Sequence, residues 1–278
     1  MIKSIDTPPL ADVQANPDGR RVPISRVGVK NIRFPIAVKD RRKDAQHTVG
    51  TIDMSVDLPH HFKGTHMSRF MEILNSHDGE ISVEALPVIL RTMRERLSAE
   101  TAHLCIAFPY FLPKEAPVSG AEGLLSYDCA FDASSGTEDD FVLTVNVPVT
   151  TLCPCSREIS ARGAHNQRSM VTVQARFTEE LWIEEVVALV DESASCGLYP
   201  VLKRSDEKWV TEQAYDNPRF VEDLVREVTL RLRSMPQVTW FNVHVVNFES
   251  IHEHDAYAQV EEPGPGRPAA SRQSRARP

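Results

Sequence analysis

The segment TTLCPCSREISARGAHNQR, residues 150–168, concentrates reactive side chains between two strand-like apolar runs. It holds two thiols, Cys153 and Cys155, and the imidazole of His165. Pro154 fixes its own φ and biases the residue before it away from helix, which predicts an extended Cys-Pro-Cys unit with both sulfurs on one side. This spacing differs from the Cys-x-x-Cys of a zinc finger or a thioredoxin-type pair. We therefore expect a functional site in this segment.

A metal site is one chemistry that these residues suit. A thiolate and an imidazole, here from Cys153 and His165, are ligands for zinc or another transition ion, and a catalytic site adds a third protein ligand. Glu207, or His252 and His254, are candidates for that third position. The alternative is that Cys153 and His165 are simply packed side chains.

Proton transfer is the second chemistry. The segment NFESIHEHD, residues 247–255, places Glu249 close to His252 and His254, and imidazoles with neighbouring carboxylates move protons near neutral pH. The alternative for this segment is a polar surface turn. Glu222 lies one position off the apolar stripe of a predicted helix, and its simplest role is an exposed pair with Arg226.

Basic residues cluster locally in an acidic chain of net charge −8. That net charge disfavours nucleic acid and anionic membranes as partners. A small polyanion such as a nucleotide suits the clusters better, and solvated loop charges are the alternative. Because no glycine-rich phosphate loop is present, side chains would have to hold the phosphates. The clustered residues are Arg157, Arg162, Arg168, Lys203 and Arg204.

The composition is that of an ordinary globular protein, with 41% hydrophobic residues in 278. No apolar run reaches the length of a membrane span, and MIKSIDTPPLADVQ lacks the basic start and apolar stretch of a signal peptide. We therefore expect a cytoplasmic protein. Five cysteines, an odd number, favour reduced thiols over a disulfide framework.

Hydrophobic periodicity predicts a repeated order of strands and helices. The first half is expected to form strands at 25–38 and 47–57, helices at 68–76 and 83–98, and strands at 102–111 and 123–133. The second half is expected to form strands at 141–149 and 169–177, helices at 179–191 and 218–234, and strands at 238–248 and 256–260.

This repeat predicts an α+β protein of two β-β-α-α-β-β-like modules, with antiparallel sheets and helices on one face. The predicted organisation is a flexible N-terminal arm over 1–22, a first module over 23–137, a second module with most of the site residues over 138–261, and a disordered tail over 262–278.

Four stretches together resemble one enzyme family. LCPCSREIS, GAHNQRS, LYPVLKRSDEKWVTEQAYDNPRFVEDLVR and NFESIHEHDA resemble GTP cyclohydrolase I of type IB, and the likeness runs from about residue 22 to about residue 259. The resemblance implies the tunnelling fold and a homotetramer. It also implies conversion of GTP and water to 7,8-dihydroneopterin triphosphate and formate, the first step of tetrahydrofolate biosynthesis. One divalent metal (Zn, Mn or Fe) is implied, with no nicotinamide or flavin.

The resemblance also implies roles for individual residues. Cys153 becomes the catalytic, metal-site cysteine, with His165 and Glu207 as the companion ligands and Cys155 as a support of the loop. His252, His254 and Glu222 belong to the same pocket, and His252 is the best candidate to protonate the departing ring nitrogen. Glu249 and Glu222 remain alternatives for holding the guanine edge. Our hypothesis for the triphosphate is contact with Arg157, Arg168, Lys203 and Arg204.

Two other functions fit part of the sequence. One is a tunnelling-fold nitrile reductase acting on a deazaguanine, in which a nucleophilic cysteine forms a thioimide and NADPH supplies hydride. The other is a non-catalytic purine-binding or structural zinc protein, although a structural zinc site normally has four protein ligands.

Overall fold

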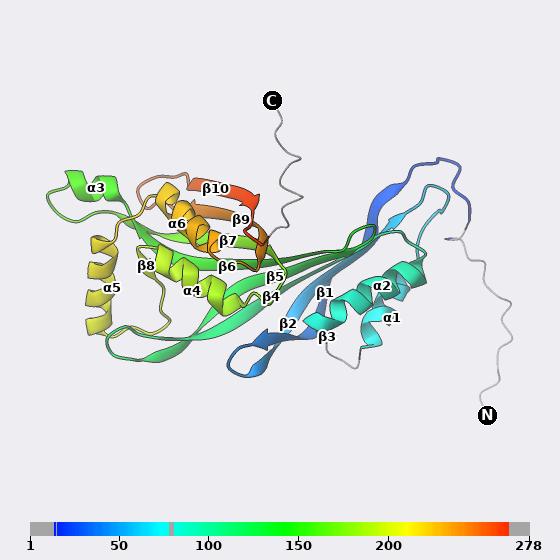
Figure 1. The fold of residues 1–278 in the computed structure, drawn as a ribbon, viewed down its shortest axis with the longest axis horizontal. Helices are drawn as coiled ribbons and strands as arrows, with labels where there is room; N and C mark the ends of the chain where they lie inside the picture. Colours follow the sequence, from blue (N-terminus) through cyan, green and yellow to red (C-terminus); the bar gives the residue numbers. More distant parts are fainter. Residues whose placement is uncertain (1–13, 15, 78–80, 267–278) are drawn as a thin grey trace. The chain divides into compact units, whose positions relative to one another are not determined.

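The structure is a computed structural model that describes residues 14, 16–77 and 81–266 (Figure 1). Its contacts divide the chain into two compact units, and several long strands contribute residues to both. Over the described residues, unit 1 comprises 14, 16–37, 49–77, 81–106 and 132–140, and unit 2 comprises 38–48, 107–131 and 141–266.

The first half of the chain forms long strands and one pair of helices. The elements are β1 (Ile24–Asp40), β2 (Asp44–Leu58), α1 (Met67–Asn75), β3 (Ile81–Ser82), η1 (Val83–Ala85), α2 (Leu86–Leu97), β4 (Ala102–Glu115) and β5 (Glu122–Ser135). Helices α1 and α2 pack together in unit 1 and bury Phe70, Ile73, Ile89 and Met93. The sequence predicted these two helices because their apolar residues recur three and four positions apart.

The second half repeats the order with additions. The elements are β6 (Asp140–Leu152), α3 (Pro154–Ile159), β7 (Asn166–Phe177), α4 (Ile183–Ser193), β8 (Cys196–Gly197), α5 (Arg204–Asp216), α6 (Val221–Arg233), β9 (Val238–Asn247) and β10 (Ala256–Pro263). Within the described residues the strands hydrogen-bond in the order β10-β9-β7-β6-β5-β4-β2-β1-β3, and β8 pairs with β6.

In unit 2 the strands β6, β7, β9 and β10 pair antiparallel, and one helix layer covers them. Helix α6 packs on β9 and β10, and α4 packs beside α6 (Figure 1). Alternate residues of the strands, such as Val171, Val173 and Val243, are at most 1% exposed. The α+β class with helices on one face of an antiparallel sheet is therefore confirmed.

Several predicted boundaries are wrong. Helix α4 begins at Ile183 rather than residue 179, and α6 begins at Val221 rather than 218. Helix α5 was not predicted as a separate helix. Only Asp206 and Ala214 are buried on it, so it has no apolar stripe for periodicity to detect. Asn31 has φ of 61°, which confirms the irregularity expected in the first strand.

The ends of the chain are described only in part. Residues 1–13, 15 and 267–278 lie outside the described residues, so most of the predicted arm and tail does as well. Of the arm, Pro17 forms a β-bridge with Phe62. Strand β10 extends through Pro263, past the predicted boundary at residue 262. The predicted module boundaries at 23, 137 and 261 follow sequence order rather than contacts, and they stay a prediction.

Candidate active site

One end of the unit 2 sheet collects many of the predicted site residues. Because β6, β7 and β9 pair antiparallel, the end of β6, the start of β7 and the end of β9 meet at the same end of the sheet. This brings the loop from Cys153 to His165 to the same sheet end as the turn that follows Asn247. The Phe248 N–H donates to the Arg168 carbonyl at 3.0 Å, which joins the two segments.

The Cys-Pro-Cys unit is not extended, so that prediction is wrong. Cys153 is the N-cap of helix α3, and Pro154 occupies the first turn, where its fixed φ favours helix and its missing N–H costs nothing. The Cys153 Sγ accepts a hydrogen bond from the Ser156 N–H at 3.5 Å. Cys155 lies within the helix and is exposed, whereas Cys153 is half-buried. The two thiols therefore occupy different environments.

Cys153 and His165 are neighbours at the base of the loop. The Cys153 N–H donates to the His165 carbonyl at 3.1 Å. Ser156 links the same two residues, because its Oγ donates to the Cys153 carbonyl at 3.2 Å and accepts from the His165 N–H at 3.1 Å. A loop that is closed in this way holds its thiol and its imidazole at fixed backbone positions.

His165 is also held through its ring. Its Nδ1 lies 3.1 Å from Gln167 Oε1, and Gln167 Nε2 donates to Thr151 Oγ1 at 2.9 Å. Gln167 and Thr151 face each other across the β6–β7 ladder. The imidazole therefore has one nitrogen engaged by the sheet, and over the described residues no hydrogen bond is made by the other nitrogen.

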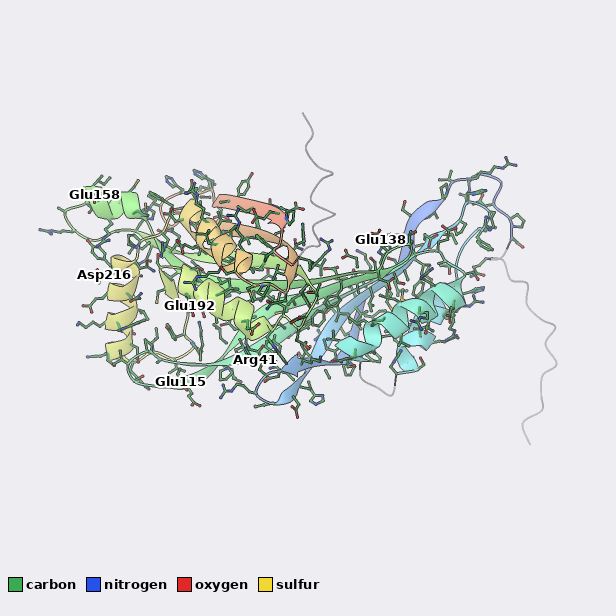
Figure 2. All side chains as sticks on the ribbon, viewed as in Figure 1. Arg41, Glu115, Glu138, Glu158, Glu192 and Asp216 are labelled. Carbon is green, nitrogen blue, oxygen red and sulfur yellow. The ribbon has the colours of Figure 1, made fainter. Side chains whose placement is uncertain are left out.

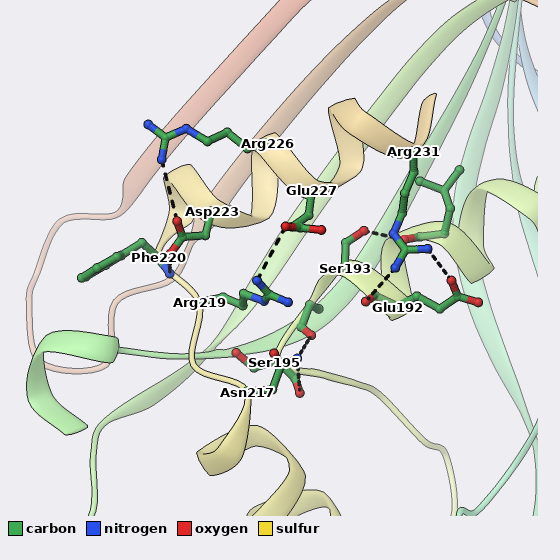
Figure 3. A network of polar contacts seen from close by, with 12 residues as sticks. Glu192, Ser193, Ser195, Asn217, Arg219, Phe220, Asp223, Arg226, Glu227 and Arg231 are labelled. Carbon is green, nitrogen blue, oxygen red and sulfur yellow. Dashed lines mark hydrogen bonds and ion pairs between the residues drawn. The ribbon is translucent and has the colours of Figure 1, made fainter. Parts of the chain in front are cut away.

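The start of helix α6 lies next to the end of β6. The Arg219 N–H donates to the Leu152 carbonyl at 3.0 Å, and Asn217 Nδ2 donates to the Ala194 carbonyl at 2.8 Å, as part of the polar network around this connection (Figure 3). Glu222, in the first turn of α6, is exposed. The expected Glu222–Arg226 pair is wrong, because Arg226 pairs with Asp223 at 3.7 Å.

Lys203, Arg204 and Glu207 form a second group at the start of α5, where all three are exposed. Buried Asp206 fixes this helix end, since its carboxylate accepts from Ser119 Oγ at 2.6 Å and from the N–H groups of Lys203 and Val118. Desolvation raises the pKa of Asp206, but the hydrogen bonds from Ser119, Lys203 and Val118 outweigh it and hold that pKa well below its usual range.

Lys114 of β4 anchors the segment that leads into α5. Its Nζ donates to the Leu198 carbonyl at 2.9 Å, forms an ion pair with Asp191 at 2.6 Å and lies over the Tyr199 ring. Burial raises the pKa of Asp191, and Lys114 offsets part of that shift. The chain before α5 is therefore fixed by a half-buried ion pair as well as by Asp206.

Arg157 already has partners in the other end of α5. Its guanidinium lies 4.7 Å from the Tyr215 ring centroid and 4.0 Å from Asp216 Oδ1. Figure 2 shows Glu158 of α3 and Asp216 of α5 at the same end of unit 2. Because Asp216 is exposed, the ion pair is weak and leaves Arg157 accessible to an anion.

The turn after β9 carries a pair of stacked imidazoles. The His252 and His254 rings have centroids 4.9 Å apart with 14° between their planes, and both side chains are exposed. Glu249 is half-buried in the same turn. The segment is a polar turn at a strand end, which agrees with either interpretation of its sequence.

The candidate metal ligands lie in two separate places on unit 2. Over the part of the chain that the structure describes, no three His, Cys, Asp or Glu side chains gather closely enough to hold an ion. Cys153 and His165 fit a metal ion by donor type, because they place a thiol and an imidazole on one loop whose ends share a backbone hydrogen bond. Glu207 lies nine residues before Asp216, or about 13 Å along α5 at 1.5 Å per residue. The structure thus joins the backbones of two predicted ligands and places Glu207 in a separate group.

Sequence reasoning missed Gln167 and Asp206. The signal for Gln167 was present, because the period-two pattern of β7 places Gln167 and Ser169 on the same face as buried Val171. A polar residue at a core position requires a partner. The signal for Asp206 was its place as the third residue of a helix, where a carboxylate can accept from the N-cap N–H.

The fold matches solved structures. A uricase from Bacillus fastidious superposes with a TM-score of 0.52 at 8% identity, covering 86% of this chain and 92% of the uricase. At that identity the likeness concerns the fold alone, and it confirms the predicted tunnelling fold. In addition, none of the described helices combines the length and apolar character required to cross a membrane.

Sequence comparison defines the family. A sequence profile of the family described as Type I GTP cyclohydrolase folE2 matches residues 10–258. The GTP cyclohydrolase FolE2 of Citrifermentans bemidjiense is 56% identical over 94% of this chain and 98% of its own length. That of Pelobacter propionicus is 57% identical over 91% of this chain and 98% of its own length. The chain belongs to the FolE2 family of type I GTP cyclohydrolases.

Proposed function

We propose that this chain is a GTP cyclohydrolase that converts GTP and water to 7,8-dihydroneopterin triphosphate and formate, the first step of tetrahydrofolate biosynthesis. The observation that carries the proposal is 56% identity over 94% of the chain to a relative named for that activity. The family assignment favours this activity over the nitrile reductase and over a non-catalytic purine-binding or structural zinc protein.

A divalent metal, Zn, Mn or Fe, is part of the proposal. Cys153 and His165 would hold it, with Glu207 as the predicted third donor. When bound, the ion would supply Lewis acidity that makes water nucleophilic near neutral pH. The support for Cys153 and His165 is the backbone hydrogen bond that joins them at the base of their loop. No nicotinamide or flavin is required, because the reaction is hydrolysis followed by rearrangement.

The chain's own residues would orient the purine and move protons. Water adds at C8 of the guanine, and His252, beside His254, would protonate the departing ring nitrogen. A second hydrolysis releases formate, and the ribose then opens, rearranges and recloses onto the exposed amine. Glu249 and Glu222 stay alternatives for the guanine edge. Half-burial favours Glu249, because a carboxylate shielded from water forms stronger hydrogen bonds than exposed Glu222.

The triphosphate would be held by basic side chains from two places. Lys203 and Arg204 stand exposed at the positive N-terminal end of α5, which favours an anion. Arg157 of α3 and Arg168 of β7 would contribute from a second group, at the sheet end that carries the loop from Cys153 to His165. Since the two groups are separate on one chain, the predicted homotetramer would allow neighbouring copies to complete one site. The homotetramer is a proposal, and the cytoplasmic location stays a prediction.

The test is formate release from GTP by purified protein that is first treated with chelator and then reloaded with zinc, manganese or ferrous iron. We expect formate and a fluorescent oxidised pterin after reloading, and neither before it. An assay with NADPH and a deazaguanine nitrile runs beside it. Absence of formate from every reloaded sample would reject the proposal, and NADPH oxidation would favour the nitrile reductase.

A further inference from the structure

A chain of side-chain hydrogen bonds leads from His165 across three strands. His165 Nδ1 lies 3.1 Å from Gln167 Oε1, and Gln167 Nε2 donates to Thr151 Oγ1 at 2.9 Å. Thr151 Oγ1 lies 2.8 Å from Ser169 Oγ, which donates to Asn247 Oδ1 at 2.7 Å. These hydrogen bonds therefore run from the imidazole to β7, to β6, back to β7 and then to β9.

These polar groups occupy core positions. Thr151 and Ser169 are fully buried, and Asn247 and Gln167 are 3% and 7% exposed. The same faces of the same strands otherwise carry buried valine, such as Val245. Valine would fill such positions without the cost of removing polar groups from water. A fully connected row of hydrogen bonds in this place fixes the orientation of its side chains, which apolar packing alone does not do.

The donors and acceptors along this row of hydrogen bonds are fixed in one direction. An amide nitrogen only donates and an amide oxygen only accepts. Since Gln167 Nε2 donates to Thr151, its Oε1 is left to face His165, and the nitrogen opposite it must carry the proton. The Thr151 hydroxyl then donates to Ser169, which donates to Asn247. The opposite direction would require the amides of Gln167 and Asn247 to reverse together.

We infer that Gln167 is a positioning residue that holds His165 as the Nδ1–H tautomer and leaves the lone pair of Nε2 for a divalent metal. Thr151, Ser169 and Asn247 hold Gln167 in turn. Metal-binding histidines are commonly oriented by a hydrogen bond from their second ring nitrogen. The inference rests on the metal site of the proposed function and adds a residue to it.

The chain provides a matched control at Gln174. Gln174 is also on β7, also faces a threonine of β6 and also directs its Nε2 to that hydroxyl, Thr144 Oγ1, at 3.5 Å. Its Oε1 accepts from Asn242 instead of an imidazole. Gln167→Leu and Gln174→Leu thus remove the same kind of side chain from one strand, and only the first touches His165.

The first measurement is zinc affinity of the full chain by competition with a chromophoric chelator. We expect Gln167→Leu to bind zinc about 10- to 100-fold more weakly than wild type, the usual effect of losing such a partner. Gln174→Leu should match wild type. Gln167→Glu should restore binding, because its carboxylate also accepts from Nδ1–H. Equal affinity of Gln167→Leu and wild type would overturn the inference.

The second measurement reads the tautomer directly. Long-range ¹H–¹⁵N spectra of metal-free protein, with His165→Ala to assign the ring signals, should show a protonated Nδ1 on His165. Gln167→Leu should lose that preference while circular dichroism stays unchanged. If Gln167→Leu does not fold, the wild-type spectrum decides alone. A protonated Nε2 with a bare Nδ1 in wild type would contradict the inference.

The two proposals fail separately. If wild type shows the Nδ1–H tautomer and binds zinc but releases no formate from GTP, the proposed function fails and the role of Gln167 stands. If wild type releases formate but Gln167→Leu keeps full zinc affinity, the role of Gln167 fails and the proposed function stands.

Discussion

The two halves of the chain share an order of strands and helices but differ in their connections. Strands β1 and β2 are joined by three residues, Arg41–Lys43, whereas β6 and β7 are joined by thirteen, 153–165. Similarly, α1 and α2 are joined by ten residues, 76–85, and α4 and α6 by twenty-seven, 194–220, which include all of α5.

The longer connections carry many of the predicted site residues. Cys153, Arg157 and His165 lie in the first of them, and Lys203, Arg204 and Glu207 lie in the second. Glu249, His252 and His254 follow in the turn between β9 and β10. The strands and paired helices of both halves therefore serve as a rigid support, and reactive groups are placed on loops that the support can extend without losing its core.

The largest expected effect is a difference in activity between variants of the two thiols in one loop. Cys153→Ala should abolish formate release, because it removes a predicted metal ligand, whereas Cys155→Ala should leave appreciable activity because Cys155 is exposed on α3. Turnover and metal content of the purified variants are the measurements. Equal loss from both variants would show that the loop works through two thiols.

The second prediction tests whether the first half of the chain contributes to stability and not to the binding of GTP. Leu74→Ala removes a fully buried side chain and should lower the free energy of unfolding by about 2–5 kcal/mol. Urea denaturation measures it, and Met71→Ala on the same helix, where Met71 is 37% exposed, is the control. We expect the KM for GTP of folded Leu74→Ala to equal that of wild type. A changed KM would contradict the interpretation that the first half supports the fold without taking part in the site.

The third effect concerns the connection that holds α5. Lys203→Ala and Arg204→Ala should each raise the KM for GTP by about 10- to 100-fold through loss of a charge-assisted contact, with kcat little changed. Lys208→Ala is the matched control, because Lys208 lies on the same helix and pairs with Glu212 at 3.3 Å. An unchanged KM would remove Lys203 and Arg204 from the site.

The smallest effect is the pH dependence that Asp206 gives to this connection. Its folded pKa lies below the unfolded value of about 3.9, so its stabilisation is present above about pH 4 and is lost as pH falls towards the folded pKa. The Tm of wild type should therefore exceed that of Asp206→Asn at neutral pH, and the difference should narrow in acid. A constant difference would contradict the role of the carboxylate.

Elements with strong periodicity could be predicted from the sequence. The alternation Val171, Val173, Ala175 specifies β7, and the stripe that includes Leu224 and Val228 specifies α6, because burial of one face fixes each period. Helix α5 could not be found in this way, since its position depends on Ser119 and Val118, which are distant in sequence.

The sequence predicts a set of site residues but not their geometry. The motifs predict Cys153 and His165 as site residues, yet Pro154 is compatible with both an extended unit and a helix start, and only the hydrogen bonds of Ser156 decide for the helix. Gln167 was overlooked because its role depends on strand pairing. Such pairings are long-range contacts that local pattern does not fix.

Because Cys155 is exposed, it can serve as a site for selective chemical labelling of the loop. Burial raises the pKa of Cys105 to about 12, of Cys196 to about 11, and of Cys129 further, so these thiols remain protonated and slow to react. A maleimide dye should therefore modify Cys155 first, two residues from the proposed metal ligand Cys153. Its fluorescence would report loop movement during nucleotide binding without a cysteine-free background.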